Sequence, residues 1–257
     1  MRAARVVTAR FIPGSLRSCP PDLILAAHGS ADPRSATVAH ALAGRIRRLR
    51  PALEVRTAFL ERSEPRLTDV LDGVAARRES AVVVPMLLAN AYHAHVDVPS
   101  AIEASGARAL RADVLGEDPA LIAVLGQRLA EAGVSPGDRD LGVIVTAVGS
   151  SSDVANARTA TVAAALGVSA LWAGVEVAFA TGPAPTVAEA AQRLRRRGAR
   201  RFVVAPWFLA YGRITDRVAE SAAALDIPMA APLGSHNLVA ATLLDRFDEQ
   251  RSGRLAA

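Results

Sequence analysis

Two histidines and a glutamate stand at equivalent points of three consecutive apolar segments. His28 directly follows the first apolar run, Glu61 follows the second, and His93 lies in the loop after the third. Imidazole and carboxylate groups are suitable ligands for a borderline divalent metal such as Fe²⁺, Co²⁺, Ni²⁺ or Zn²⁺. A neutral imidazole beside a carboxylate can also accept a proton from an acid. These residue types therefore predict a site for metal binding, proton transfer or both.

The surrounding pattern predicts a parallel α/β fold that brings these residues together. The expected strands are at residues 23–27, 55–59, 81–88 and 110–115. Between them, apolar residues recur at helical spacing, as from Val38 to Ile46. The strand segments lack strict alternation, which is typical of strands covered on both faces. Because ligands bind at the carboxyl ends of strands in such sheets, we expect His28, Glu61 and His93 at one rim.

Blocks of the sequence occur twice at a nearly constant offset. AAHGS at 26–30 returns as TAVGS at 146–150, and VVVPMLLA at 82–89 returns as VVAPWFLA at 203–210. Such steady offsets indicate a duplication.

The duplication predicts the domain organisation. We expect a loose tail at residues 1–21, a catalytic unit at 22–135, a degenerate duplicate unit at 136–250 and a C-terminal tail at 251–257. Each unit is expected to be a parallel four-stranded sheet with helices on both faces, with the active-site cleft between the units. The turn-rich segment GVSPGDRD at 133–140 is the expected linker.

The two units differ where chemistry is expected. Val148 stands at the position of His28, and Thr181 at that of Glu61. The second unit has GRITD where the first has AYHAHVD, so it has no histidine there. The joint loss of these side chains from the duplicate favours a shared function for them in the first unit.

Single histidines and carboxylates also have structural interpretations. A histidine after a strand often hydrogen-bonds within a turn, and Glu61 has Arg62 and Arg56 available for ion pairs. His40 lies on an amphipathic segment, which favours a structural role. His236 opens the last helical segment, where we expect it to cap the helix.

Composition excludes several classes of protein. Of the 257 residues, 51% are hydrophobic and 21% charged, which is typical of a globular chain and not of a disordered one. One cysteine cannot form an internal disulfide or a Cys-rich metal site, which fits a cytoplasmic setting. No apolar stretch is long enough to span a membrane.

Four arginines and no acid fall in residues 1–21. The rest of the chain is therefore nearly neutral and does not indicate a nucleic-acid partner.

Three motifs carry a resemblance to the sirohydrochlorin chelatases. LILAAHGSADPR resembles the family's first strand, with its GHGS-like turn followed by D-P-R. AFLERSEPRLTDVL resembles F-x-E-x-x-x-P, and VVVPMLLANAYHAHVDVP resembles P-x-x-L-x-x-G-Y-H-x-x-x-D-I-P. Order and spacing agree over residues 22–135, and the second unit resembles the degenerate half of two-unit forms. Asn90 and Ala91 depart from the family pattern, and neither change removes a ligand.

The resemblance implies a class II chelatase, which inserts Fe²⁺ or Co²⁺ into sirohydrochlorin without ATP. That substrate is a tetrapyrrole with eight carboxylates, and the product would be sirohaem or cobalt-sirohydrochlorin, the latter of which leads to cobalamin. The metal is a substrate, and no prosthetic group is implied. The family's catalytic residues fall on His28, Glu61 and His93. His28 and His93 would present the metal, and His28 with Glu61 would accept the pyrrole protons.

Arginine is suited to the carboxylates of such a substrate. The candidates for substrate contacts are Ser30, Arg34, Asn90, Tyr92 and Arg213, with Arg62, Arg66 and Arg217 as further arginines near the rim.

Two alternative functions stay open, a non-catalytic metal or tetrapyrrole carrier and a metal-dependent hydrolase. Ala27 before His28 excludes the R-H-G motif of histidine phosphatases, and the absence of lysine excludes a standard phosphate loop. We expect no nucleic-acid or membrane partner. A monomer is expected, because the duplication supplies in one chain what smaller relatives make by dimerising; a homo-oligomer is the alternative.

Overall fold

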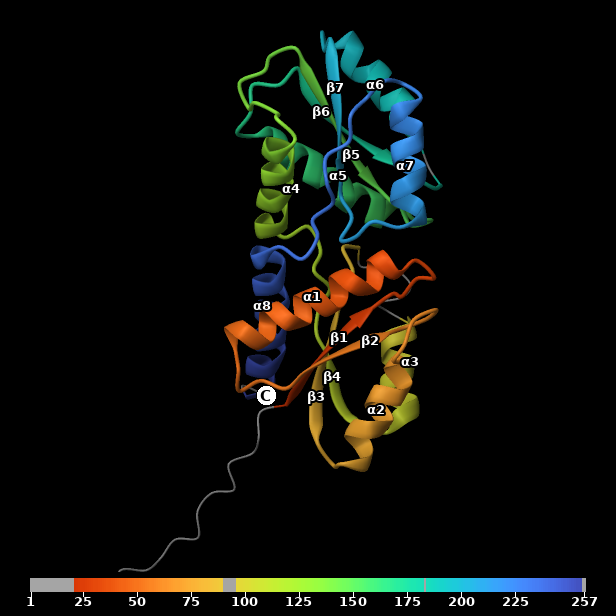
Figure 1. The fold of residues 1–257 in the computed structure, drawn as a ribbon, viewed down its shortest axis with the longest axis vertical. Helices are drawn as coiled ribbons and strands as arrows, with labels where there is room; N and C mark the ends of the chain where they lie inside the picture. Colours follow the sequence, from red (N-terminus) through yellow and green to blue (C-terminus); the bar gives the residue numbers. More distant parts are fainter. Residues whose placement is uncertain (1–20, 90–95, 183, 256–257) are drawn as a thin grey trace, which may run out of the picture.

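The computed structural model describes residues 21–89, 96–182 and 184–255. Two α/β units follow one another along the long axis of the molecule (Figure 1). The first part of the chain forms β1 (Asp22–Ala27), α1 (Pro33–Leu49), β2 (Val55–Phe59), α2 (Leu67–Ala76), β3 (Ser80–Pro85), α3 (Val98–Ser105), β4 (Arg108–Arg111) and α4 (Pro119–Glu131). The second part forms β5 (Leu141–Ala147), α5 (Asp153–Gly167), β6 (Gly174–Phe179), α6 (Val187–Arg196), β7 (Arg201–Pro206), α7 (Arg213–Ala223) and α8 (Asn237–Leu255).

Both sheets are parallel, which confirms the predicted fold class. Over the described residues, the first sheet has the strand order β2-β1-β3-β4 and the second has the order β6-β5-β7. β1 and β5 are buried along their whole lengths, as expected for central strands covered by helices on both faces.

The prediction of a fourth strand in the second sheet is wrong for the part of the chain that the structure describes. The equivalent segment pairs with β7 only at Val204. The amide of Val204 donates to the carbonyl of Pro228 (2.8 Å), and its carbonyl accepts from the amide of Ala230 (2.9 Å). Pro228 and Pro232 flank this short pairing, and proline has no amide hydrogen with which to extend a ladder.

The two units exchange their last helices. α4 packs against α5 and β7 of the second unit, whereas α8, at the end of the chain, packs against α1 and β3 of the first (Figure 1). α4 and α8 also contact each other. One continuous core therefore contains Leu25 of the first sheet, Val145 of the second, Leu125 of α4 and Phe247 of α8. Because one core spans both units, packing does not separate them into two domains. The bounds 22–135 and 136–250 stay a prediction from the sequence duplication.

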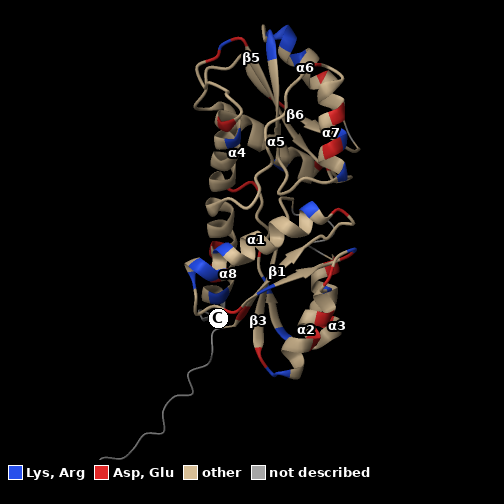
Figure 2. Cartoon of the chain, viewed as in Figure 1, with Lys and Arg blue, Asp and Glu red and all other residues tan. Residues whose placement is uncertain are grey.

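Charged residues of both signs are interspersed over the two units (Figure 2). In the chain segments described, no helix is long and apolar enough to cross a lipid bilayer.

Candidate active site

The backbone around the ends of β1 and β2 brings His28 and Glu61 together. Ala27 and Phe59 are paired in the parallel register, and the pairing continues beyond both strands. The amide of Leu60 donates to the carbonyl of Ala27, and the amide of Glu61 donates to that of His28, both at 3.0 Å. His28 Nε2 consequently lies 3.4 Å from Glu61 Oε1. Two of the three predicted site residues thus face each other at the predicted rim.

Gly29 makes this close approach feasible. Its φ is +90°, and a Cβ added there would lie 1.7 Å from the backbone oxygen of Glu61. Only glycine adopts such a conformation readily and leaves the space open. This glycine thus gives the neighbouring loop room to approach the turn after β1.

Both members of the pair are accessible, because the side chains of His28 and Glu61 are 43% and 44% exposed. Glu61 Oε1 also lies 3.3 Å from Arg62 Nε. The alternative ion pair with Arg56 does not form, since Arg56 contacts Asp22 at 3.0 Å instead. Glu61 therefore bridges an imidazole and a guanidinium at an open rim.

Three of the predicted site residues lie outside the described residues, namely Asn90, Tyr92 and His93. Within the described ranges, no group of three or more His, Cys, Asp or Glu residues is arranged to hold a metal ion. His28 and Glu61 supply two groups of suitable chemistry, and the third predicted ligand, His93, falls in the segment that is not described.

Ser30 stabilises the loop that carries His28. Its amide donates to Ser63 Oγ (3.1 Å), and Ser63 Oγ donates back to its carbonyl (2.9 Å). Its own hydroxyl accepts from the amide of Asp32 (3.0 Å). Ser30 is thus placed beside the site, with its hydroxyl engaged in the turn before α1.

Arg34 is held by carboxylates from both units. Asp32 caps α1 by accepting from the amide of Arg34 (3.0 Å), and it also accepts from Arg34 Nε at 3.0 and 3.1 Å. Arg34 Nη1 and Nη2 donate to the two carboxylate oxygens of Asp216 on α7, at 3.1 and 2.5 Å. These hydrogen bonds lower the pKa of Asp32 to about 2 and raise that of Arg34 above its ordinary value. The sequence predicted the arginine but missed Asp216.

The other candidate arginines have different surroundings. Arg213 and Arg217 are exposed on α7, and the charge of Arg213 helps to lower the pKa of Asp32. Arg66 donates from Nη1 to the carbonyl of Leu60 (3.1 Å), within its own loop.

A cavity of about 580 Å³ lies beside Glu61, on the side of the first sheet covered by α2 and α3. Its lining includes Arg66, Thr68, Asp97 and Ser100. Since this cavity belongs to the first unit alone, it is not the cleft that the resemblance implies between the units, which stays a prediction.

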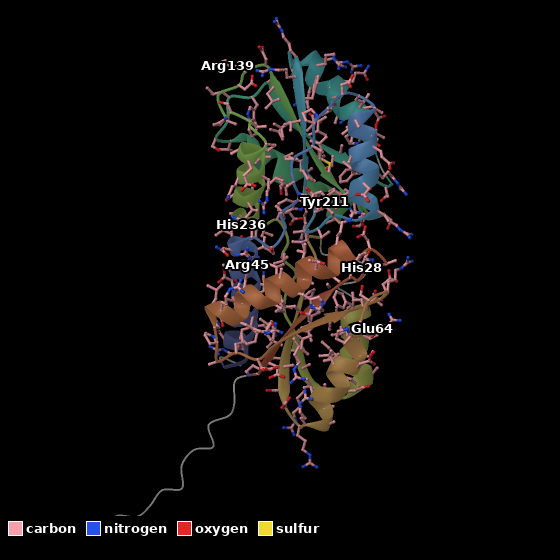
Figure 3. All side chains as sticks on the ribbon, in the orientation of Figure 1. His28, Arg45, Glu64, Arg139, Tyr211 and His236 are labelled. Atoms are coloured by element: carbon pink, nitrogen blue, oxygen red, sulfur yellow. The ribbon has the colours of Figure 1, made fainter. Side chains whose placement is uncertain are left out.

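The facing rim of the second unit presents apolar side chains. His28 lies at the end of the first unit that is nearest the second, and Tyr211 lies across from it at the near end of the second unit (Figure 3). Val148, at the position equivalent to His28, and Tyr211 are each 41% exposed. The second unit thus presents exposed apolar side chains after β5 and before α7, next to the charged residues that begin α7.

His236 has the predicted capping role. Its Nδ1 accepts from the amide of Leu238 (3.1 Å) at the start of α8. Burial and the charge of Arg128 lower the pKa of His236. His40 packs edge-on against the Phe59 ring, with ring centroids 5.7 Å apart, in keeping with the structural role expected for it.

Comparisons with known proteins agree with the fold and the motifs. The CbiX family model matches residues 22–132 and again residues 142–250. A sirohydrochlorin cobaltochelatase from Priestia megaterium is 26% identical over 216 residues, covering 78% of this chain and 71% of that protein.

Two solved structures share the fold at low sequence identity. SirB from Bacillus subtilis with Fe³⁺ superimposes with a TM-score of 0.74 at 22% identity, over 90% of this chain and 95% of that one. CbiX, described as the terminal enzyme for biosynthesis of siroheme in denitrifying bacteria, has a TM-score of 0.66 at 22% identity, over 90% and 99% of the two chains. With both repeats matching the family model, the chain belongs to the CbiX family, the family of sirohydrochlorin chelatases that its motifs resemble.

Proposed function

We propose that this chelatase inserts Co²⁺ or Fe²⁺ into sirohydrochlorin without ATP. The observation that carries the proposal is the His28–Glu61 pair, 3.4 Å apart at the carboxyl ends of β1 and β2. The duplicate unit has the same backbone arrangement with Val148 and Thr181 in their places. The named relatives, a sirohydrochlorin cobaltochelatase and a SirB structure with Fe³⁺, support the choice of substrate and metals.

The pair has the groups that metal insertion requires. Insertion must remove water from the cation and two protons from the pyrrole nitrogens. A neutral imidazole at His28 can bind the incoming cation or accept a proton, and the Glu61 carboxylate can accept a proton beside it. His93 is the second metal ligand in this proposal, on the strength of its motif alone.

The second unit supplies a surface for the macrocycle. A tetrapyrrole has broad apolar faces and a charged periphery. Val148, at the position equivalent to His28, and Tyr211, which lies across from His28, offer exposed apolar area, and burying such area is favourable at about 25 cal/mol per Å². Arg34 and Arg213 lie near the carboxyl-end rim, where a carboxylate of the substrate can reach a guanidinium. Each unit would thus contribute a different part of one site.

The initial rate of metal insertion tests the proposal. The absorption spectrum of sirohydrochlorin is followed with Co²⁺ and, anaerobically, with Fe²⁺. We expect multiple turnovers per enzyme, and we expect His28→Ala and His93→Ala each to lose most of the rate above the uncatalysed background. Wild-type rates in both variants would reject the assignment.

The same assay separates the alternatives. A carrier would change the spectrum stoichiometrically without turnover. A metal-dependent hydrolase would leave the tetrapyrrole unchanged and cleave a phosphoester or amide with Zn²⁺. A monomeric state and a cytoplasmic location stay predictions, the first of which light scattering on the purified protein would check.

A further inference from the structure

One guanidinium links the loop after β1 to the second unit. Arg34 donates from Nε and Nη2 to Asp32 and from Nη1 and Nη2 to Asp216, so two carboxylates share the guanidinium. Asp32 belongs to the same turn as Arg34, whereas Asp216 comes from the first turn of α7, 182 residues after Arg34. The start of α1 and the start of α7 lie close together where the two units meet (Figure 1).

The two carboxylates differ in how firmly they are held. The Asp32 side chain is only 14% exposed, and it also caps α1 through the amide of Arg34. The Asp216 side chain is 45% exposed, and the Arg34 side chain that it contacts is 46% exposed. Exposed ion pairs contribute only about 0–1 kcal/mol, because water and salt compete for both charges. Asp216 is therefore the partner that another carboxylate can replace.

Asp216 has a second cationic partner within reach when it leaves Arg34. Asp32, Asp216, Arg34 and Arg213 together carry no formal net charge. Arg213 is three residues before Asp216 on α7, a spacing at which opposite charges on a helix interact. When a second carboxylate takes the outer edge of Arg34, Asp216 can turn to Arg213.

We propose that Asp216 is a placeholder carboxylate, which occupies the outer edge of the Arg34 guanidinium until a carboxylate of the tetrapyrrole displaces it. Asp216 thereby determines specificity, because only a substrate with a suitably placed anionic group gains the Arg34 contact. This inference rests on the proposed function, since it takes the substrate to be an anionic tetrapyrrole.

Equilibrium binding of metal-free sirohydrochlorin, followed by its absorption or fluorescence, tests the placeholder without requiring turnover. The proteins compared are the wild type, Asp216→Asn, Arg34→Gln and the double variant. Asp216→Asn keeps the side-chain shape but binds the guanidinium more weakly, so we expect Kd to fall about two- to fivefold. Arg34→Gln should raise Kd by a similar factor, and in that background Asp216→Asn should have no effect.

Asp248→Asn is the matched control. Asp248 on α8 forms a two-pronged contact with Arg50, which caps the other end of α1. This pair has the same chemistry and similar exposure, but it is remote from the turn that carries His28. We expect Asp248→Asn to leave Kd unchanged.

Two results would overturn the placeholder. One is an unchanged or higher Kd for Asp216→Asn while Asp248→Asn binds like the wild type. The other is an equal fall in Kd for Asp216→Asn in the Arg34→Gln background, which would indicate a general effect of charge.

If the wild type inserts metal and either result is found, only the placeholder role of Asp216 fails. A wild type that binds sirohydrochlorin but inserts neither Co²⁺ nor Fe²⁺ refutes the proposed function instead.

Discussion

The two units have the same backbone turn at the ends of their first two strands but different side chains on it. Gly29 and Gly149 have φ angles of +90° and +93°. A Cβ at either position would lie within 2.1 Å of a carbonyl oxygen in the neighbouring loop. The amide of Thr181 donates to the carbonyl of Val148 at 2.8 Å, just as the amide of Glu61 donates to that of His28. The scaffold thus depends on glycine and backbone hydrogen bonds, and it persists where the imidazole and carboxylate are gone.

The comparison also indicates why a chain whose proposed site lies in the first unit contains both units. The first sheet relies on α8 from the end of the chain, and the second relies on α4. The duplicate further contributes the exposed Val148 and Tyr211, and the Asp216 contact to Arg34. The second unit has therefore kept the residues that pack the fold, while its side chains at the carboxyl ends of the strands differ from those of the first unit.

The largest expected effect comes from the exchanged helix. Phe247 on α8 is 1% exposed in the shared core, so Phe247→Ala should lower the free energy of unfolding by about 3–5 kcal/mol. Chemical denaturation measures this loss. Hydrogen exchange should speed up in β1 and β3 more than in β5 and β6, and the opposite order would contradict the helix exchange.

Substitutions at equivalent positions of the two units should differ most clearly in their effect on the rate of metal insertion. His28→Ala should lower kcat/KM for metal insertion about a hundredfold, since an imidazole that binds metal or moves protons contributes at least that much. Val148→Ala at the equivalent place should change it less than about threefold, a small effect of lost apolar contact. Steady-state rates with Co²⁺ check both, and similar losses in the two variants would contradict an asymmetric site.

The equivalent glycines Gly29 and Gly149 allow the effect of the turn on stability to be distinguished from its effect on kcat. Gly29→Ala and Gly149→Ala each force a side chain against a carbonyl at positive φ, so both should destabilise the protein by about 2 kcal/mol. Only Gly29→Ala displaces Glu61 from His28, and we expect it alone to lose about tenfold in kcat at a temperature where both variants remain folded. Thermal unfolding and rates on the same samples decide this, and equal kcat values would refute the role of the turn.

Loss of the carboxylate should have a smaller effect than loss of the imidazole. Glu61→Gln should reduce kcat about tenfold, because His28 remains to accept protons while the carboxylate 3.4 Å from it is lost. Thr181→Val is the counterpart in the duplicate and should leave kcat unchanged. A Glu61→Gln variant with the wild-type kcat and pH profile would exclude proton transfer through this residue.

The smallest effect concerns pH and the link between α1 and α8. Hydrogen bonds from Arg50 hold the pKa of Asp248 below its ordinary value. A lowered pKa stabilises the folded state above the unfolded-state pKa of about 4, and this contribution is lost as pH falls through the folded-state value. Asp248→Asn should therefore cost about 0.5 kcal/mol at pH 7 and nothing in strong acid. A cost that persists unchanged at low pH would show that the charge is not responsible.

Local patterns predicted the parts of the fold and site that depend on nearby residues. The apolar runs located β1 and β2, and the rule for parallel sheets placed His28 beside Glu61. The Asp-Pro-Arg sequence has the features of a helix start, with Asp32 as the cap.

Features that depend on distant partners could not be predicted. An amphipathic helix has the same pattern whichever sheet it covers, so the exchange of α4 and α8 left no signal in the sequence. The pairing of Arg34 with Asp216 depends on how the units meet; its only trace was the aspartate that ends both GRITD and AYHAHVD. The absence of a fourth strand in the second sheet was indicated locally by Pro228 and Pro232, because proline disfavours a paired strand. The duplication favoured four strands in each unit and outweighed this signal.

Anomalous diffraction from crystals soaked in Co²⁺ tests most directly whether the chemistry belongs to the first unit. We expect cobalt within coordination distance of His28 Nε2, about 2.1 Å, and none at the equivalent turn around Val148. In His28→Ala crystals under the same soak, the peak should be lost. Cobalt bound elsewhere with His28 uncoordinated, or an undiminished peak in the variant, would contradict the account.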